Sequence, residues 1–294
     1  MVVVAAAAAR RSRRVMEWEP MLETILHGGG RWGRLYFSGL QVDIGFYSLL
    51  VILAAALYAV GRAWGRGWVA IAVGILAAVP AVLFAGYYLR LLDNAAWFYN
   101  LRALPYVELA GAGAGLLAGV VQGRVAVPVG ALLLILVPHL KPLLTPLDLS
   151  RLRDRCEGEV CLQSTPSTCG PASAATLLRR LGMAATEREL AVEARSSASG
   201  TEIWYLARAL RARGVDAVAM MAPGEIVAPS IAGVLLRGNA GHFIAVLRQT
   251  PEEVTVMDPM HGMAVIPRAE LARRYRFTGF FLLAQRWRVA EERR

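Results

Sequence analysis

The chain has 294 residues, 56% of them hydrophobic, and its apolar residues are concentrated before residue 145. This distribution excludes an entirely soluble protein and favours an integral membrane protein with an attached soluble domain. The formal net charge of +10 is not accompanied by a basic stripe with interleaved aromatic residues, so we expect no nucleic-acid partner.

Residues 1–41 are predicted to form a basic arm and an interfacial segment. Four arginines follow an apolar run that is too short to span a bilayer, which is the reverse of the order in a secretory signal. Between Trp18 and Leu40, aromatic and charged residues surround three consecutive glycines. Such a mixture is typical of a segment at the membrane surface.

Four apolar stretches have the length needed to cross a bilayer, at about 42–60, 68–89, 103–122 and 125–144. Residues 42–145 are therefore predicted to form a four-helix transmembrane region in contact with lipid. In the third stretch, glycines recur at positions 111, 115 and 119. Either they give one helix face a smooth surface for a close neighbour, or they reflect the abundance of glycine in the whole chain.

The placement of arginines predicts the orientation of these spans. Only Arg62, Arg66 and Arg124 fall in the first and third connections, whereas many basic residues precede the first span, lie in the second connection and follow the fourth span. With four spans, the positive-inside rule places both termini and the soluble domain in the cytoplasm, as expected for a bacterial inner-membrane protein. Three or five spans would place the domain outside.

Two cysteines leave a second interpretation of the compartment open. Cys156 and Cys161 are close enough for a small disulfide loop, which would indicate an extracytoplasmic, oxidising compartment. They could equally be reduced and without a role. A zinc site is less favoured because the spacing is four residues and no second ligand pair follows, so we expect neither a metal nor a cofactor.

Residues 156–286 have the pattern of a soluble α+β domain with a mainly antiparallel sheet, followed by a basic tail at 287–294. Helical patterns come first: one begins near Cys169, one follows a capping box at Thr186–Glu189, and one covers 202–213. Short periodic runs then predict strands, with one more helix at 267–275. The predicted strands cover 215–221, 231–236, 243–248, 254–257, 264–266 and 277–284.

Cys169 is the candidate nucleophile. It precedes Gly170 and Pro171 at the start of a predicted helix, where proline is favoured in the first turn. The positive end of the helix dipole favours a thiolate, which is the reactive form of cysteine. Taken alone, a cysteine is more often a buried core residue.

His242 and Asp258 are the candidate partners of this cysteine. His242 begins one predicted strand and Asp258 ends the next, so a hairpin would bring them to the same end of the sheet. His261 is the competing histidine, but it lies in a turn. Asp258-Pro259 can also be read as a plain turn signal.

The chemistry of acyl transfer requires these residue types. A thiol needs an imidazole to share its proton, a third group to orient the ring, and donors for the oxyanion that forms on attack. We therefore expect Cys169 to be the nucleophile, His242 the general base and acid, Asp258 the orienting group and Gln163 an oxyanion donor. An exposed loop amide is the alternative for Gln163.

Gln163, Cys169-Gly170-Pro171-Ala172, Gly241-His242-Phe243 and Asp258-Pro259 resemble the motifs of cysteine peptidase family 39. That family contains bacteriocin-processing peptidases of papain-like fold that cleave leader peptides after a Gly-Gly pair. The resemblance covers residues 156–286 and implies the same four site residues. It implies hydrolysis of a peptide or protein substrate by a cysteine peptidase.

The chain departs from many family members in two respects. It cannot contain a phosphate-binding loop ending in Gly-Lys-Ser/Thr, because Lys141 is its sole lysine and is followed by proline. Any exporter partner would therefore be a separate protein. Thr168 precedes the nucleophile, where an aspartate is expected in exporter-linked members.

Two other functions use the same residues. One is a non-catalytic peptide-binding domain of peptidase ancestry, and the other is a papain-like acyltransferase or transpeptidase. We predict a membrane-anchored cysteine peptidase in preference to both.

Overall fold

The computed structural model describes residues 34–37, 40–121, 129, 141–142 and 144–286. The chain divides into two compact units. The helical unit comprises residues 1–86 and 108–136, and the sheet unit comprises residues 87–107 and 137–294. The sheet unit thus extends beyond the predicted domain at 156–286.

Two helices of the helical unit are long and apolar enough to cross a membrane. They are α3 (Ile44–Trp64) and α4 (Trp68–Tyr88), which correspond to the first two predicted stretches. A short antiparallel pair, β1 (Arg34–Phe37) with β2 (Leu40–Asp43), precedes α3. The sequence reasoning placed no strands there.

The prediction of four spans is supported only in part. The third stretch contains η1 (Val107–Ala112) followed by α6 (Gly113–Val120). The axis of this segment is bent by 99° from that of α5 (Ala96–Arg102), which precedes it. Two helices, or up to three if the bent pair is one span, have the required length and composition among the described residues. Pro105 contributes to the break, because proline cannot continue a helix. The fourth stretch, 125–144, lies almost wholly outside the described residues.

Glycines of α6 allow close packing on α3. A Cβ at Gly115 would lie 2.3 Å from the carbonyl oxygen of Ala54, and one at Gly119 would lie 2.2 Å from that of Tyr58. Real side chains cannot adopt such contacts, so these two positions require glycine at this helix separation. Of the two interpretations of the four-residue spacing, these contacts favour a smooth face for a close neighbour.

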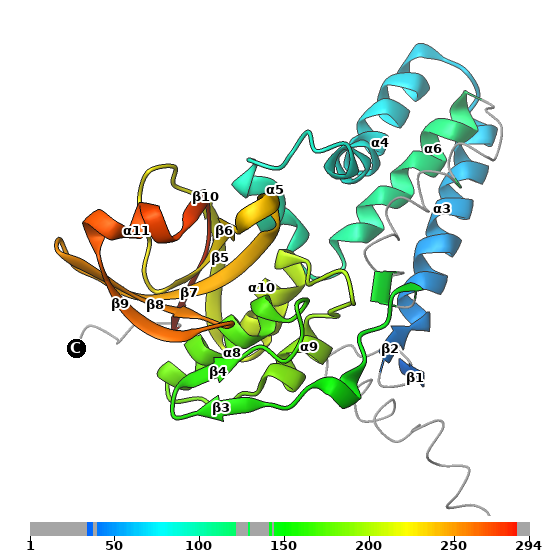
Figure 1. Ribbon diagram of the computed structural model, residues 1–294. Helices are drawn as coiled ribbons and strands as arrows, with labels where there is room; N and C mark the ends of the chain where they lie inside the picture. Colours follow the sequence, from blue (N-terminus) through cyan, green and yellow to red (C-terminus); the bar gives the residue numbers. More distant parts are fainter. Residues whose placement is uncertain (1–33, 38–39, 122–128, 130–140, 143, 287–294) are drawn as a thin grey trace, which may run out of the picture. The chain divides into compact units, whose positions relative to one another are not determined.

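The sheet unit is built on a six-stranded, fully antiparallel sheet in the order β5-β10-β6-β7-β8-β9 (Figure 1). This confirms the predicted mainly antiparallel sheet. The strands are β5 (Val215–Met221), β6 (Ser230–Leu235), β7 (Gly241–Gln249), β8 (Glu253–Asp258), β9 (Gly262–Pro267) and β10 (Arg276–Arg286).

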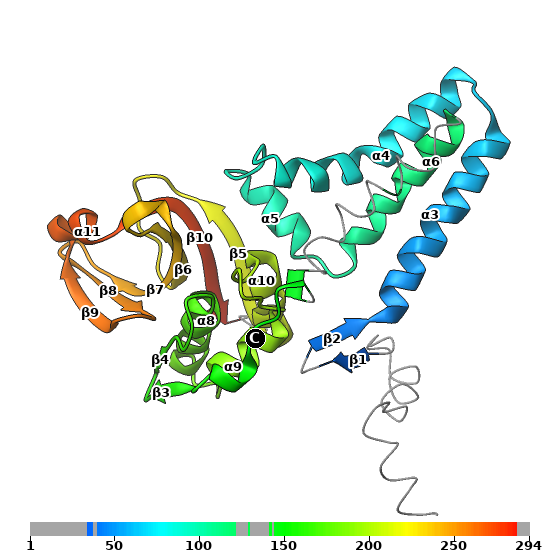
Figure 2. The ribbon, with the colours of Figure 1, turned by 45° about the vertical axis from the view of Figure 1, so that its right-hand side comes forward.

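Both faces of the sheet are apolar. Successive side chains of a strand point to opposite faces, and β7 has consecutive apolar residues that therefore enter two different cores. On β7, Ala245 and Leu247 join the core formed with α8 (Cys169–Arg180), α9 (Glu187–Glu193) and α10 (Ile203–Ala212). Ile244 and Val246 join a second core that includes Leu271 of α11 (Arg268–Arg274). Figures 1 and 2 show α8 and α10 on one side of the sheet and α11 on the other.

The segment between α4 and η1 packs against the sheet unit's edge. The side chain of Asn100 donates to the carbonyl oxygen of Ala219 on β5 and accepts from its N–H, both at 2.8 Å. The amide therefore makes the two hydrogen bonds that a neighbouring strand would make to Ala219 on this edge strand. The rings of Tyr87 and Tyr99 contact Trp204 of α10.

We expect Asn100→Ala to lower the free energy of unfolding by about 1–3 kcal/mol, because two hydrogen bonds are lost and a backbone pair of β5 is left without partners. The change is measured as a shift in the midpoint of chemical unfolding of the detergent-solubilised chain. Asn94→Ala, at an exposed position in the same segment, is the matched control and should leave the midpoint unchanged. Equal midpoints for the two variants would contradict the role given to Asn100.

Candidate active site

Cys169 is the first residue of α8, and Thr168 is its N-cap. Its side chain is 9% exposed and lines a cleft of about 400 Å³. Four residues later on the same helix, the hydroxyl of Ser173 donates to the carbonyl oxygen of Phe243 at 3.3 Å. The helix carrying the thiol is thus tied to the strand carrying the histidine.

His242 lies between Cys169 and Asp258. Its Nε2 is 3.0 Å from Oδ1 of Asp258, and its ring lines the same cleft as the Cys169 side chain. Burial disfavours a charge on the ring, but the interactions with Asp258 and Cys169 outweigh it and raise the pKa of His242 to about 9. At neutral pH the ring is therefore an imidazolium.

Asp258 ends β8 and is 2% exposed. Besides His242 it has three donors: the N–H of Met260 at 2.9 Å, Nδ1 of His261 at 3.1 Å and the hydroxyl of Tyr275 at 3.0 Å. Burial favours the neutral acid, but the donors outweigh it and hold the pKa of Asp258 far below its ordinary value. The carboxylate is fixed and charged.

Of these donors, the sequence analysis names His261 but not Tyr275. His261 was weighed as the competing base, and the structure places it on the opposite carboxylate oxygen from His242, largely exposed. Tyr275 was missed, because it is the C-cap of a short helix seventeen residues after Asp258 and its sequence surroundings carry no signal. Burial and the nearby Asp258 carboxylate raise the pKa of Tyr275 to about 12, so it stays a donor.

Gln163 directly follows β4 (Val160–Leu162), and its N–H donates to the carbonyl oxygen of Pro259 at 2.9 Å. This bond ties the loop before Cys169 to the turn after Asp258. The side-chain Nε2 donates to the carbonyl oxygen of Thr165, and Oε1 is buried without a hydrogen-bond partner. Thr165 thus occupies one of the two N–H donors of this amide.

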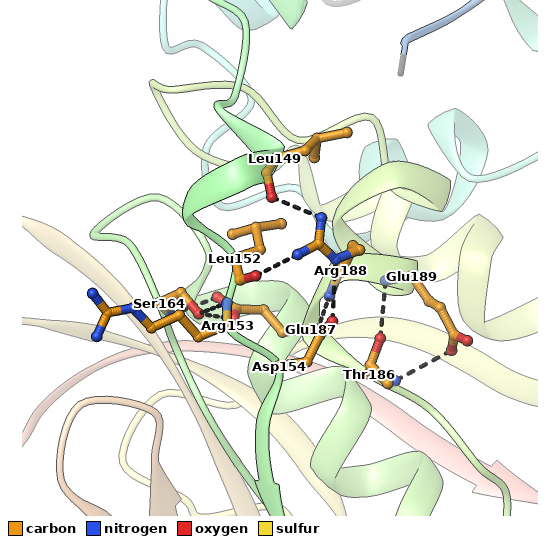
Figure 3. A network of polar contacts seen from close by, with 9 residues as sticks. All are labelled: Leu149, Leu152, Arg153, Asp154, Ser164, Thr186, Glu187, Arg188 and Glu189. Carbon is orange, nitrogen blue, oxygen red and sulfur yellow. Dashed lines mark hydrogen bonds and ion pairs between the residues drawn. The ribbon is translucent and has the colours of Figure 1, made fainter. Parts of the chain in front are cut away.

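A polar network holds the loop that carries Gln163 (Figure 3). The buried carboxylate of Glu187 accepts from the N–H of Ser164 at 2.6 Å and from its hydroxyl at 2.5 Å. Arg188 pairs with Asp154 and donates to the carbonyl oxygens of Leu149 and Leu152. The predicted capping box of Thr186 and Glu189 is present at the start of α9. It fixes the helical turn that carries Glu187 and Arg188.

Cys156 and Cys161 form a disulfide across the hairpin of β3 (Arg155–Glu157) and β4. Cys169 is the free cysteine among the described residues. The disulfide lies two residues before Gln163 and fixes the strand from which the loop departs.

The Peptidase C39 family model matches residues 158–287. An uncharacterized protein of Methanothermobacter thermautotrophicus is 34% identical over 132 residues, which cover 43% of this chain and 88% of the relative. A second, from Methanothermobacter marburgensis, is 32% identical and is covered over 86% of its length. The chain belongs to the peptidase C39 family.

Two solved peptidase structures are similar to part of the chain. The peptidase domain of Streptococcus ComA, a bifunctional ABC transporter of a quorum-sensing pathway, has 16% identity and a TM-score of 0.38, with coverage of 42% of this chain and 96% of that domain. A double-glycine-motif protease from an AMS/PCAT transporter, solved with a leader peptide, has 24% identity and a TM-score of 0.38, with coverage of 46% and 95%.

We expect His242 to retain its proton up to a pH of about 9, because its pKa is raised in the folded chain. The resulting stabilisation is fully present below the ordinary pKa of histidine and is lost as the pH rises from there through about 9. In Asp258→Asn the pKa of His242 should fall to its ordinary value or below, since burial remains while the carboxylate is removed. Histidine-selective ¹⁵N NMR measures this, because the chain has four histidines. His242→Gln assigns the signal. A wild-type titration near pH 6.5 would contradict the geometry.

Proposed function

We propose that the chain is a membrane-anchored cysteine peptidase that hydrolyses peptide bonds through Cys169, His242 and Asp258. The observation that carries the proposal is one buried imidazole that is hydrogen-bonded to a fixed carboxylate and lines the same cleft as a free thiol. Membership of the peptidase C39 family supports the same reaction.

In the proposed mechanism, His242 already holds the proton of Cys169 as an imidazolium beside the thiolate, and the sulfur attacks the carbonyl carbon of the scissile bond. The tetrahedral intermediate collapses as His242 donates that proton to the leaving amine nitrogen, which breaks the C–N bond and leaves a thioester. His242 then takes a proton from water, the hydroxide attacks the thioester, and the carbon–sulfur bond breaks.

Asp258 holds the ring of His242 in one orientation and stabilises the imidazolium in both steps. Its other three donors fix the carboxylate, so the ring has a defined position before substrate arrives. Gln163 would donate to the oxyanion through the amide N–H that Thr165 does not occupy. Its buried Oε1 without a partner shows that the present rotamer leaves hydrogen-bonding capacity unused.

The lining of the cleft favours small residues in the substrate. Gly200, Gly233 and Gly241 contribute backbone without side chains on the walls around Cys169. We propose that the peptidase cleaves after small residues such as a Gly-Gly pair, as in the processing of a leader peptide. A substrate backbone with small side chains can approach these glycines closely. A bulky substrate side chain would contact the wall and hold the substrate backbone away from it.

We expect Cys169→Ala to lower the cleavage rate of a Gly-Gly-containing peptide by about a thousandfold or more, because the nucleophile is removed. A peptide with an electrophilic carbonyl should label the wild-type chain at Cys169 and leave this variant unlabelled. Mass analysis of the products distinguishes hydrolysis from transfer of the acyl group to an amine. Cleavage that persists in Cys169→Ala would overturn the proposal.

The face of the membrane on which the site lies follows from the packing of residues 87–107. This segment comes directly after the second apolar helix and packs on the sheet, so both lie on one face of the membrane. If α3 and α4 each cross once, that face is also the face of the N-terminal arm. The arginines that precede α3 then favour the cytoplasmic side for the site.

The disulfide argues for the opposite compartment, since cytosolic thiols are normally reduced. We give the charge distribution more weight, because the basic residues of three separate segments agree. Those segments are the arm before α3, residues 87–107 and residues 141–155, whereas only Arg62, Arg66 and Arg124 lie elsewhere near the predicted spans.

We expect reporters fused before Met1 and after Arg294 to give the same signal: fluorescence of a cytoplasmic reporter protein and no activity of a phosphatase that folds only outside. Different faces for the two termini would contradict the packing argument. Phosphatase activity at both termini would instead show that the disulfide identifies the compartment. Fluorescent reporter alone, without fusion, serves as the expression control.

A further inference from the structure

The cleft around Cys169 contains a cation that the mechanism does not use. The residues lining it include three ionisable side chains, namely Lys141, Cys169 and His242. No carboxylate lines the cleft among the residues that the structure describes. Lys141 is also the sole lysine of the chain. It lies outside the residues matched by the family model, 158–287.

Lys141 is held at the cleft by Glu202. Its Nζ lies 2.8 Å from Oε1 of Glu202, and the hydroxyl of Tyr87 donates to Oε2 of the same carboxylate at 3.1 Å. The side chain of Lys141 is 34% exposed and that of Glu202 is 12% exposed. The cation is therefore the member of the pair that solvent reaches, while the anion is covered.

The backbone that carries Lys141 is fixed to the wall of the cleft. The N–H of Ala198 donates to the carbonyl oxygen of Thr145 at 2.9 Å, and Pro146 pairs with Ser197. The hydroxyl of Ser167, two residues before Cys169, donates to the carbonyl oxygen of Ala198 at 2.6 Å. The segment that carries Lys141 and the loop that carries Cys169 are thus both hydrogen-bonded to the turn at Ala198.

An ammonium group has three donors, and Glu202 occupies one of them. The others are available to a carboxylate or carbonyl oxygen in the cleft. Lys141 and His242 line the cleft, whereas the carboxylates paired with them, Glu202 and Asp258, are not among its lining residues. A cleft with this charge favours a substrate with an acidic side chain and disfavours a basic one.

We propose that Lys141 is a specificity-determining residue that binds a carboxylate of the substrate, so that preferred peptides carry Asp or Glu close to the scissile bond. The proposal rests on the proposed peptidase function and names the class of substrate for the same cleft. It also assigns a part of substrate recognition to a segment that precedes the matched peptidase domain.

The test uses the full-length chain in detergent and a set of Gly-Gly-containing peptides. Each peptide carries Glu or Gln at one position on either side of the scissile bond. At one or more positions we expect kcat/KM for the Glu peptide to exceed that for the Gln peptide on the order of tenfold, the range of a charge-assisted hydrogen bond at a partly exposed site. The ratio should fall towards one in Lys141→Met.

Lys141→Arg is the matched control, because it keeps the charge and should keep most of the preference. Both variants retain Cys169, His242 and Asp258, so loss of the ratio with similar cleavage of the Gln peptide separates recognition from catalysis. Equal rates for Glu and Gln peptides at every position in the wild-type chain would overturn the inference. A preference that survives in Lys141→Met would do the same.

Binding to the Cys169→Ala chain keeps the inference testable if no peptide is cleaved. Fluorescence anisotropy of labelled peptides should show about tenfold tighter binding for Glu than for Gln, with the difference reduced at high salt. Equal dissociation constants would sink the inference. Charge-dependent binding without cleavage by the wild type would retain it and reject the peptidase function.

Discussion

The buried ion pair of His242 and Asp258 is the interaction on which the site depends. Both side chains are almost fully buried, and a charged pair in such surroundings persists only if its remaining hydrogen-bonding capacity is satisfied. Asp258 meets this condition through Met260, His261 and Tyr275. Removal of these donors would leave a carboxylate free to turn, and the imidazole would lose its defined direction towards the thiol.

The scaffold around this pair consists of short, specific ties between elements that are distant in the sequence. Ser173 links α8 to β7, Gln163 links the loop after β4 to the turn after β8, and Glu187 links α9 to the same loop. Each tie pairs a polar group that would otherwise be buried without a partner, so it contributes to stability and to geometry together. The apolar cores on both faces of the sheet supply the remaining rigidity.

The segments next to the apolar stretches make specific contacts within the sheet unit. Asn100 completes the edge of β5, and Tyr87 and Lys141 meet on one carboxylate beside the cleft. A fragment that begins at residue 156 would lack all three contacts. The sheet unit therefore acquires a partner for its edge strand and one lining residue of its cleft from residues outside the family match at 158–287.

The sequence by itself determined the six-stranded sheet, its main helices and the candidate site residues. Alternation of apolar and polar residues gave six strands, and helical spacing with capping signals gave α8 to α11, because local periodicity reports which face of an element is buried. Cys169, His242 and Asp258 could be selected as candidates because they lie at the start of a predicted helix and at the ends of two successive predicted strands.

Only the tertiary structure decided how these residues meet. The third apolar stretch is broken rather than a straight helix, and no periodicity in the sequence measures a bend. Tyr275, the pairing of Cys156 with Cys161, and the ion pair of Lys141 with Glu202 join residues whose separation along the chain carries no signal. Such contacts depend on strand order and helix docking, which are set by the packing of the whole core and not by any local segment.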